Sequence, residues 1–175
     1  MILTAPVGHR TRPATARARE WIFNVLGPPT GLVVLDLFAG TGAVGLEALS
    51  RGAARVLFVE SWKPALGCLR TNLEKTRYSH RADVWEMDAA EAASRLKEEG
   101  AIFDLCFCDP PYRYHGLEAL LAESVLELMA PGATLVVEHR GDPPLAPRGL
   151  IPFREESFGE TVLSLWMSPE PIEEV

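Results

Sequence analysis

Short apolar runs alternate with amphipathic segments along most of the chain. A continuous apolar run is typical of a strand buried in a parallel sheet, and apolar residues three and four positions apart indicate a helix. The pattern predicts strands at Leu32–Phe38, Arg55–Glu60, Asp83–Met87, Ile102–Cys108 and Ala133–Glu138. It predicts helices at Ala14–Leu26, from the glycines after Phe38 to Arg51, at Trp62–Lys75, at Asp88–Glu99 and at Leu117–Met129, the last stopped by Pro131-Gly132.

Two further runs near the carboxyl end, Ile151–Ser157 and Thr161–Met167, are joined by Phe158-Gly159-Glu160 and predict a β-hairpin. Strands that alternate with helices predict an α/β, Rossmann-like fold. We expect a mainly parallel, seven-stranded sheet with helices on both faces and a C-terminal antiparallel hairpin. Such sheets bind ligands at the carboxyl ends of their strands. The loops of interest therefore follow Phe38, Glu60, Met87 and Cys108.

Charge is spread unevenly along the chain. The net charge is −7, but residues 1–30 hold Arg10, Arg12, Arg17 and Arg19 against Glu20, a balance of +3, so the remainder carries −10. A basic arm on an acidic body can contact phosphates locally, although a solvated first helix would carry the same charges. We expect a basic N-terminal arm at residues 1–13, one domain at 14–168 and an acidic tail at 169–175.

The three cysteines are Cys68, Cys106 and Cys108. Their odd number and their position in apolar segments argue against a disulfide framework, and their spacing is not that of a zinc site. We interpret them as small core residues in a reducing cytoplasm. The start of the chain lacks the pattern of a signal peptide, and no apolar run approaches the length of a membrane span.

The tetrapeptide Asp109-Pro110-Pro111-Tyr112 follows a buried strand directly. Adjacent prolines have no N–H and fix the backbone, so their carbonyls are acceptors with set directions. A carboxylate and an aromatic face flank them. The stretch suits a flat group with N–H donors, such as the amino group of a nucleobase, although Pro-Pro is more often a plain rigid turn.

The stretch from Gly40 to Gly45 matches G-x-G-x-x-G between a strand and a helix, and Glu60 ends the next strand. This pattern predicts a site for a nucleoside cofactor, with the acid on a ribose. NAD would place a pyrophosphate at the helix N-terminus. The preceding acid, Asp36, favours a cationic ligand such as S-adenosylmethionine instead. Asp88 is placed to accept a hydrogen bond from an adenine amino group, and Trp62 is placed to cover the adenine ring. The simpler interpretations are that Asp88 is a helix N-cap and that Trp62 is a core residue of the helix.

These motifs, taken in order and spacing, resemble those of class I S-adenosylmethionine-dependent methyltransferases that modify exocyclic amines. A narrower resemblance is to the RsmD family, which methylates the 2-amino group of a guanine in 16S ribosomal RNA. Three stretches carry it: Arg12–Glu20 is similar to the family's R-P-T-T-x-R-x-R-E block, Leu46–Gly52 to its G-L-E-A-L-S-R-G helix, and Phe158–Thr161 to its Y-G-D-T hairpin. The resemblance runs from about Arg12 to Trp166. It departs from the family in a shorter arm before Arg12 and in Ala14, which replaces a threonine.

The resemblance implies a role for each matching residue. Asp109, Pro110 and Tyr112 are the expected catalytic residues. The expected cofactor-binding residues are Asp36, Phe38, Gly40, Gly42, Glu60, Ser61, Asp88, Ala89 and Asp109. The charge pattern and the aromatic face of the tetrapeptide, rather than the resemblance alone, give the expected RNA-binding residues, which are Arg10, Arg12, Arg17, Arg19 and Tyr112. Arg113 and His115 lie just past Tyr112 and are candidates for the pocket rim, although Arg113 would equally suit a plain surface position. The resemblance implies S-adenosylmethionine as cofactor and no metal.

Three alternatives stay open on the sequence. The first is the same chemistry on an adenine of DNA or RNA, because the tetrapeptide does not distinguish the bases. The second is an NAD(P)-dependent oxidoreductase on the same glycine loop, and the third is a non-catalytic RNA-binding module. The expected partner is ribosomal RNA, which the acidic body favours in a partly assembled small subunit; we expect a cytoplasmic monomer and no membrane partner.

Overall fold

The computed structural model describes residues 3–5, 16–141 and 144–170. The basic arm, with Arg10 and Arg12, lies outside the described residues for most of its length, as do residues 171–175 of the tail. None of the helices within the described ranges is long and apolar enough to cross a membrane.

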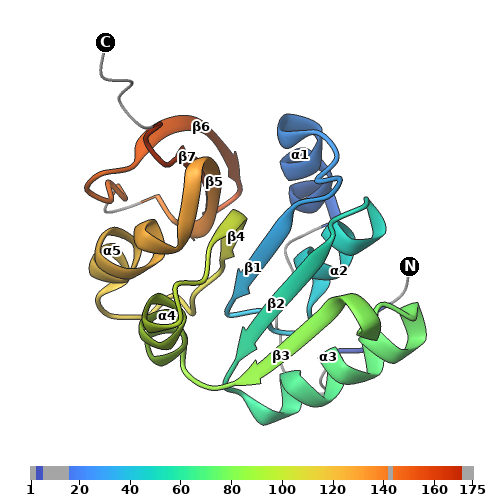
Figure 1. The fold of residues 1–175 in the computed structure, drawn as a ribbon. Helices are drawn as coiled ribbons and strands as arrows, with labels where there is room; N and C mark the ends of the chain where they lie inside the picture. The colour runs from blue at the N-terminus through green and yellow to red at the C-terminus, as the bar shows by residue number, and fades with distance from the viewer. Residues whose placement is uncertain (1–2, 6–15, 142–143, 171–175) are drawn as a thin grey trace.

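A single twisted sheet organises the described chain (Figure 1). Its seven strands lie in the order β3-β2-β1-β4-β5-β7-β6. The strands are β1 (Val33–Leu37), β2 (Arg55–Glu60), β3 (Ala82–Glu86), β4 (Phe103–Cys108), β5 (Met129–Arg140), β6 (Ile151–Phe158) and β7 (Thr161–Met167). Strands β1 to β5 pair in parallel, and β7 pairs antiparallel with both β5 and β6. The predicted fold class and its terminal hairpin are therefore confirmed.

Helices cover both faces of the sheet because successive strand residues point to opposite sides. One layer holds α1 (Ala16–Leu26), α2 (Ala43–Ser50) and α3 (Lys63–Thr76) against the face that carries Val34, Val56 and Phe58. The other holds α4 (Ala89–Glu98) and the helical segment after Gly116 against the face that carries Leu35, Leu57 and Val59. A 3₁₀ turn, η1 (Ser79–Arg81), leads into β3. Figure 1 shows the two groups of helices on opposite sides of β1 and β4.

The predicted helix at Leu117–Met129 is only partly right. The segment consists of α5 (Leu117–Ala119), a π-helical turn η2 (Leu120–Val125) and a 3₁₀ turn η3 (Leu126–Leu128). Strand β5 begins at Met129, so Pro131-Gly132 lie inside a strand instead of stopping a helix. The pairing of β4 with β5 is irregular over the same stretch, between Phe103 and Leu105, which is how the sheet accommodates a proline that has no N–H to donate.

Two of the cysteines are core residues, as predicted. Cys106 and Cys108 are fully buried in β4 and Cys68 is half-buried in α3, all as free thiols. Burial raises the pKa of both strand thiols well above the ordinary value, and nearby acids add to the effect. They are inert packing residues, which leaves the chemistry to the strand ends.

Candidate active site

The glycine loop sits at the carboxyl end of β1. Phe38, Gly40 and Gly42 all have positive φ, at 60°, 56° and 79°. Glycine adopts such angles at little cost, whereas Phe38 is held there by the surrounding structure. An added Cβ at Gly40 would stand in open space, so the backbone of the loop is accessible to a ligand.

Glu60, at the end of β2, holds the loop in shape. One carboxylate oxygen accepts from the Gly40 N–H and the other from the Trp62 N–H, each at 2.7 Å. The loop is thereby tied to the start of α3. A carboxylate has about four acceptor sites, so Glu60 retains capacity for two ribose hydroxyls.

Asp36 lies beneath the loop rather than at its surface. It is 4% exposed, and its Oδ2 accepts from the Gly45 N–H at 3.0 Å. Burial raises the pKa of Asp36 from 3.8 to about 7, although the Gly45 N–H opposes the rise; the negative charge of Glu60 adds to it. The site therefore contains an acid that ionises near neutral pH, and a cationic ligand would favour its charged form.

Asn72 on α3 braces the same loop and has no sequence motif that would have revealed it. Its side chain is fully buried. Its amide nitrogen donates to the Thr41 carbonyl at 3.0 Å and to the Thr4 carbonyl at 3.1 Å, and its oxygen accepts from the Thr4 N–H at 2.8 Å. The segment at residues 3–5 is thus joined to the glycine loop.

Asp88 is the N-cap of α4, as the simpler reading of the sequence had it. Its Oδ1 accepts from the Ala90 N–H at 2.8 Å, and the residue is exposed. Ser61 is exposed and Ala89 is buried. Trp62 is the half-buried N-cap residue of α3. The cofactor roles of these residues stay predictions.

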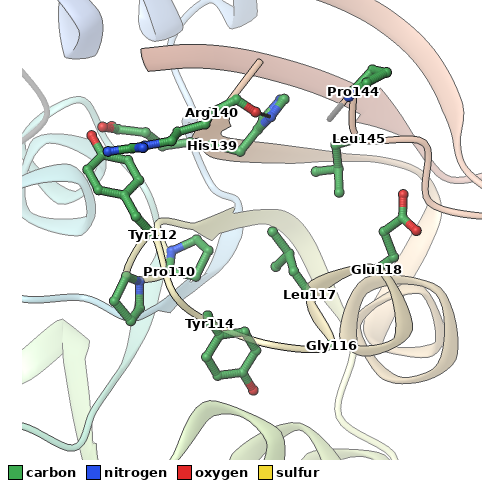
Figure 2. A pocket seen from close by; sticks show the side chains of 12 residues that line it. Pro110, Tyr112, Tyr114, Gly116, Leu117, Glu118, His139, Arg140, Pro144 and Leu145 are labelled. Atoms are coloured by element: carbon green, nitrogen blue, oxygen red, sulfur yellow. Dashed lines mark hydrogen bonds between the residues drawn. The ribbon is translucent and has the colours of Figure 1, made fainter. Parts of the chain in front are cut away.

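A pocket of about 570 Å³ opens beside the proline tetrapeptide (Figure 2). Its lining includes Pro110, Pro111 and Tyr112 after β4, residues 138–140 of β5, Tyr114, Leu117 and Leu145. Figure 2 shows Tyr112 and Arg140 together at one end and Leu117 and Glu118 at the other. Apolar walls with a few polar groups, in this volume range, are typical of a site for a small organic molecule.

Tyr112 stands exposed at the pocket, fixed from two sides. The residue is 53% exposed. The Arg140 guanidinium carbon lies 4.5 Å from its ring centre, and its hydroxyl lies 3.2 Å from the Thr161 hydroxyl. The hairpin segment at Phe158–Thr161 thus reaches the tetrapeptide, and the ring is presented to a ligand in one orientation.

Asp109 lies between the pocket and the glycine loop. Its N–H donates to the Leu37 carbonyl at the end of β1, at 3.4 Å, while the next residue, Pro110, lines the pocket. The ring of Phe38 also meets that of Tyr114, with centres 4.9 Å apart. These contacts bring the loop after β1 and the loop after β4 together at the point where strand order reverses, where such sheets bind ligands.

Acidic groups crowd around Asp109. Desolvation, and then the negative charges of Glu138, Asp36 and Glu60, raise the pKa of Asp109 well above its usual value. Asp109 keeps exposed surface, so solvent moderates the effect of desolvation, whereas the three neighbouring charges act on the carboxylate directly. Glu138 is half-buried, and desolvation raises its pKa as well. The strand ends therefore form a negative region that suits a ligand with cationic or N–H groups.

The predicted RNA-binding residues are only partly described. Arg17 is exposed on α1 and Arg19 is half-buried there, whereas Arg10 and Arg12 lie outside the described residues. Arg113 and His115 are exposed but do not line the pocket. Among the residues that the structure describes, no group of His, Cys, Asp or Glu side chains is arranged to hold a metal ion.

Three residues of β5 that line the pocket, Glu138, His139 and Arg140, were not predicted as site residues. The strand predicted at Ala133–Glu138 ends on an acid, but no motif surrounds Glu138 to mark it as a site residue. The rule that selected Asp88 and Asp109, an acid where a strand ends, also applies to Glu138. Arg140 became recognisable only once the structure had placed it on the Tyr112 ring.

Comparison with known proteins gives a consistent result. The model of a family described as "Conserved hypothetical protein 95" matches residues 2–167. The putative rRNA methyltransferase YlbH of Bacillus subtilis is 34% identical over 168 residues, which cover 94% of this chain and 91% of that protein. Ribosomal RNA small subunit methyltransferase D of Escherichia coli K12 is 33% identical over 172 residues, with coverage of 94% and 83%. A solved structure of a putative methyltransferase from Escherichia coli superposes with a TM-score of 0.80 at 31% identity, over 97% of this chain and 92% of the other.

Proposed function

The chain belongs to the RsmD family of ribosomal RNA methyltransferases, and on that premise we propose that it transfers a methyl group from S-adenosylmethionine to the 2-amino group of a guanine in small-subunit ribosomal RNA. Family membership makes it a methyltransferase. The base, the atom and the form of the RNA are the parts that we propose.

One observation carries the proposal: the acceptors for an amine adjoin the cofactor loop. The Asp109 N–H bonds to the Leu37 carbonyl, so the loops after β4 and β1 are in direct contact. An amine held by the Asp109 carboxylate and the Pro110 carbonyl would therefore lie next to a ligand on the glycine loop. Holding two reactants in line supplies up to roughly 7–11 kcal/mol of the barrier reduction.

The residues around the loop fit S-adenosylmethionine, which supplies a methyl group on a cationic sulfur when bound. The open backbone at Gly40 would receive it, and Glu60 has acceptor sites left for the ribose hydroxyls. Asp36 adds negative charge beneath the loop, and Asp88 has a second oxygen beyond its capping bond for the adenine amino group. A pyrophosphate would face these acids at a cost, which disfavours NAD.

Several residues would then act on the base. The Asp109 carboxylate and the Pro110 carbonyl accept one N–H each, so the nitrogen lone pair is turned away from them and toward the glycine loop. Positive charge that develops on that nitrogen is stabilised by Asp109. Asp109, with its raised pKa, can take the proton that the alkylated nitrogen gives up afterwards. Tyr112 stacks on the base, which must leave its helix or lie unpaired.

We propose that the basic arm at residues 1–13, with Arg17 and Arg19 of α1, contacts phosphates, and that a partly assembled small subunit is the preferred substrate. The reason is the charge of the chain: a net charge of −7 discourages binding to bare RNA along most of the surface. The proposed enzyme is a cytoplasmic monomer.

The decisive experiment incubates the protein with methyl-labelled S-adenosylmethionine and either free 16S ribosomal RNA or small subunits, followed by nucleoside analysis and mass mapping. We expect 2-methylguanosine at one position, with more label in the particle than in free RNA. Methyladenosine would overturn the choice of base. A rise in melting temperature with NAD, but not with S-adenosylmethionine, would overturn the choice of cofactor.

A further inference from the structure

Glu138 lies beside Asp109 at the edge of the sheet. Cys108 of β4 pairs with Val137 of β5, and both strands run in the same direction, so the next residue along each strand is Asp109 and Glu138. Glu138 lines the pocket with Pro110 and Tyr112. A base in the pocket whose amine reaches Asp109 would therefore present the neighbouring atom of its edge to Glu138.

The Glu138 carboxylate has no hydrogen bond or ion pair with any other residue of the described ranges. The other acids at the strand ends differ: Asp36, Glu60 and Asp88 each accept from backbone N–H groups. The Glu138 oxygens reach solvent, because no buried side-chain oxygen of the described residues lacks a partner, so a ligand that displaced this water would have to supply the donor itself. The negative charge of Glu138 also contributes to the raised pKa of Asp109, which agrees with the closeness of the two groups.

The hydrogen-bonding edge of guanine is complementary to the two neighbouring carboxylates, Asp109 and Glu138, and that of adenine is not. On the Watson–Crick edge of guanine the atom next to the 2-amino group is N1, which carries a hydrogen and donates, and it is this edge, not the N3 side, that would lie against Glu138. In adenine the ring nitrogen next to the amino group has a lone pair and accepts. Two neighbouring acceptors on the protein, at Asp109 and at Glu138, therefore match the two neighbouring donors of guanine and oppose the lone pair of adenine.

We propose that Glu138 accepts the N1–H of the target guanine and thereby selects guanine over adenine. This inference rests on the proposed function and supplies what the tetrapeptide leaves open, namely the choice of base. A site built to bond a donor rejects an analogue without it far more strongly than an apolar pocket rejects a missing methylene, because the bound analogue shields the acceptor from water and leaves it unpaired.

The test uses two RNAs that differ at one nucleotide, the target guanosine or 2-aminopurine riboside. The analogue retains the 2-amino group but has a lone pair at N1. We expect wild-type protein to methylate the guanosine RNA at least about 100-fold faster in kcat/KM. Glu138→Gln should lower the guanosine rate about tenfold, because a neutral amide oxygen accepts the N1–H less strongly than a carboxylate does. It should leave the 2-aminopurine rate unchanged or raise it up to about threefold, because the glutamine amide can turn and donate to N1. The preference should shrink at least about tenfold.

Glu156→Gln is the matched control, because Glu156 is an exposed residue of β6 outside the pocket. Its rates on both RNAs should equal those of the wild type. The ratio of the two rates cancels any contribution from the missing O6, which is the same for both proteins. An unchanged preference in Glu138→Gln with an unchanged melting temperature would overturn the inference.

If Glu138→Gln fails to fold, the comparison of guanosine RNA with 2-aminopurine RNA in the wild-type protein still tests the inference. Equal rates on the two RNAs would also remove Glu138 from base selection, although the proposed function would survive. Failure of the proposed function looks different: wild-type protein would then methylate neither RNA while it methylates adenosine elsewhere, or it would methylate nothing.

Discussion

Two sides of the site, each built from acids at strand ends, differ in what those acids bond. On the cofactor side, defined by Asp36, Glu60 and Asp88, each carboxylate accepts from a backbone N–H of the chain itself. On the acceptor side, defined by Asp109 and Glu138, neither carboxylate has a hydrogen bond to any residue within the described ranges. The same residue types at the same edge of the sheet therefore serve two purposes.

The difference shows how one edge of the sheet can hold a rigid cofactor loop and still present unpaired acceptors to a substrate. The bonds of Glu60 and Asp36 hold the glycine loop in a fixed shape before any ligand arrives, and the bond of Asp88 caps α4, so little ordering is needed on binding. On the acceptor side, desolvation and then the repulsion between the carboxylates raise the pKa of Asp109. A ligand with N–H donors relieves that repulsion, and the relief is available for binding and catalysis only while the acids stay unpaired. Changes on the cofactor side should therefore alter stability and cofactor affinity, and changes on the acceptor side should alter methyl transfer.

The largest expected effect is that of Asp109→Asn. The amide no longer offers two acceptors or a negative charge to the reacting nitrogen, so kcat should fall about 10²- to 10³-fold. The affinity for S-adenosylmethionine, measured by calorimetry, should change less than threefold. The melting temperature should stay the same or rise, because a carboxylate with a raised pKa is removed from a crowded site. Activity near that of the wild type would remove Asp109 from the mechanism, and a large loss of stability would place it on the structural side of the comparison.

Asp36→Asn separates the charge of a cofactor-side acid from its hydrogen bond. Between pH 4 and about 7 the native protein holds a proton on Asp36 and the unfolded chain does not, because burial raises the pKa from 3.8 to about 7. Stability therefore falls as the pH rises through this range and levels off above about 7, by at most about 4 kcal/mol. Asparagine has no such titration and can still accept from Gly45.

The variant should consequently be more stable than the wild type at pH 8 and similar to it near pH 4, as measured by urea unfolding at several pH values. Its affinity for S-adenosylmethionine should be lower at pH 8, since the negative charge beneath the loop is gone. If the free energy of unfolding changed with pH equally in the variant and the wild type, Asp36 would not be the titrating group. Unchanged cofactor affinity would show that its hydrogen bond to Gly45, not its charge, is what the site uses.

How far the sequence predicted this site depended on whether a feature is local. Strand β2 was predicted at its observed bounds, and the glycine loop and the tetrapeptide were found because each lies within a few residues of a buried strand. The segment after Gly116 was predicted as one helix, since its apolar spacing does not distinguish α, π and 3₁₀ turns. The position of Pro131 inside β5 was missed because proline there reads as a helix stop.

Contacts between distant segments could not be predicted. The place of Glu138 beside Asp109 depends on the register of β4 and β5, and the place of Arg140 on Tyr112 depends on the pairing of β5 with β7. Asn72 bonds to Thr41 and Thr4, which lie 31 and 68 positions before it in the sequence, and no local pattern predicts contacts over such separations. The residues that carry chemistry were therefore largely visible in the sequence, whereas those that hold or complement them became visible in the fold.

The smallest effect is expected from a single methyl group on the cofactor side, in Gly45→Ala. A Cβ at Gly45 would collide with the ring of Phe58 and stand 2.9 Å from Asp36 Oδ2, and both neighbours are buried. Relief of the collision would require the ring or the loop to move, so we expect a loss of about 1–3 kcal/mol in the free energy of unfolding and weaker cofactor binding.

Gly67→Ala is the matched control, because its Cβ would meet nothing within 4 Å on α3. That change should raise stability by about 0.5–1 kcal/mol, as alanine does in a helix, and leave cofactor binding unchanged. If Gly45→Ala changed the free energy of unfolding and the cofactor affinity no more than Gly67→Ala does, the glycine loop would not be rigid. The hydrogen bonds of the cofactor-side acids would then not explain how the two sides of the site differ.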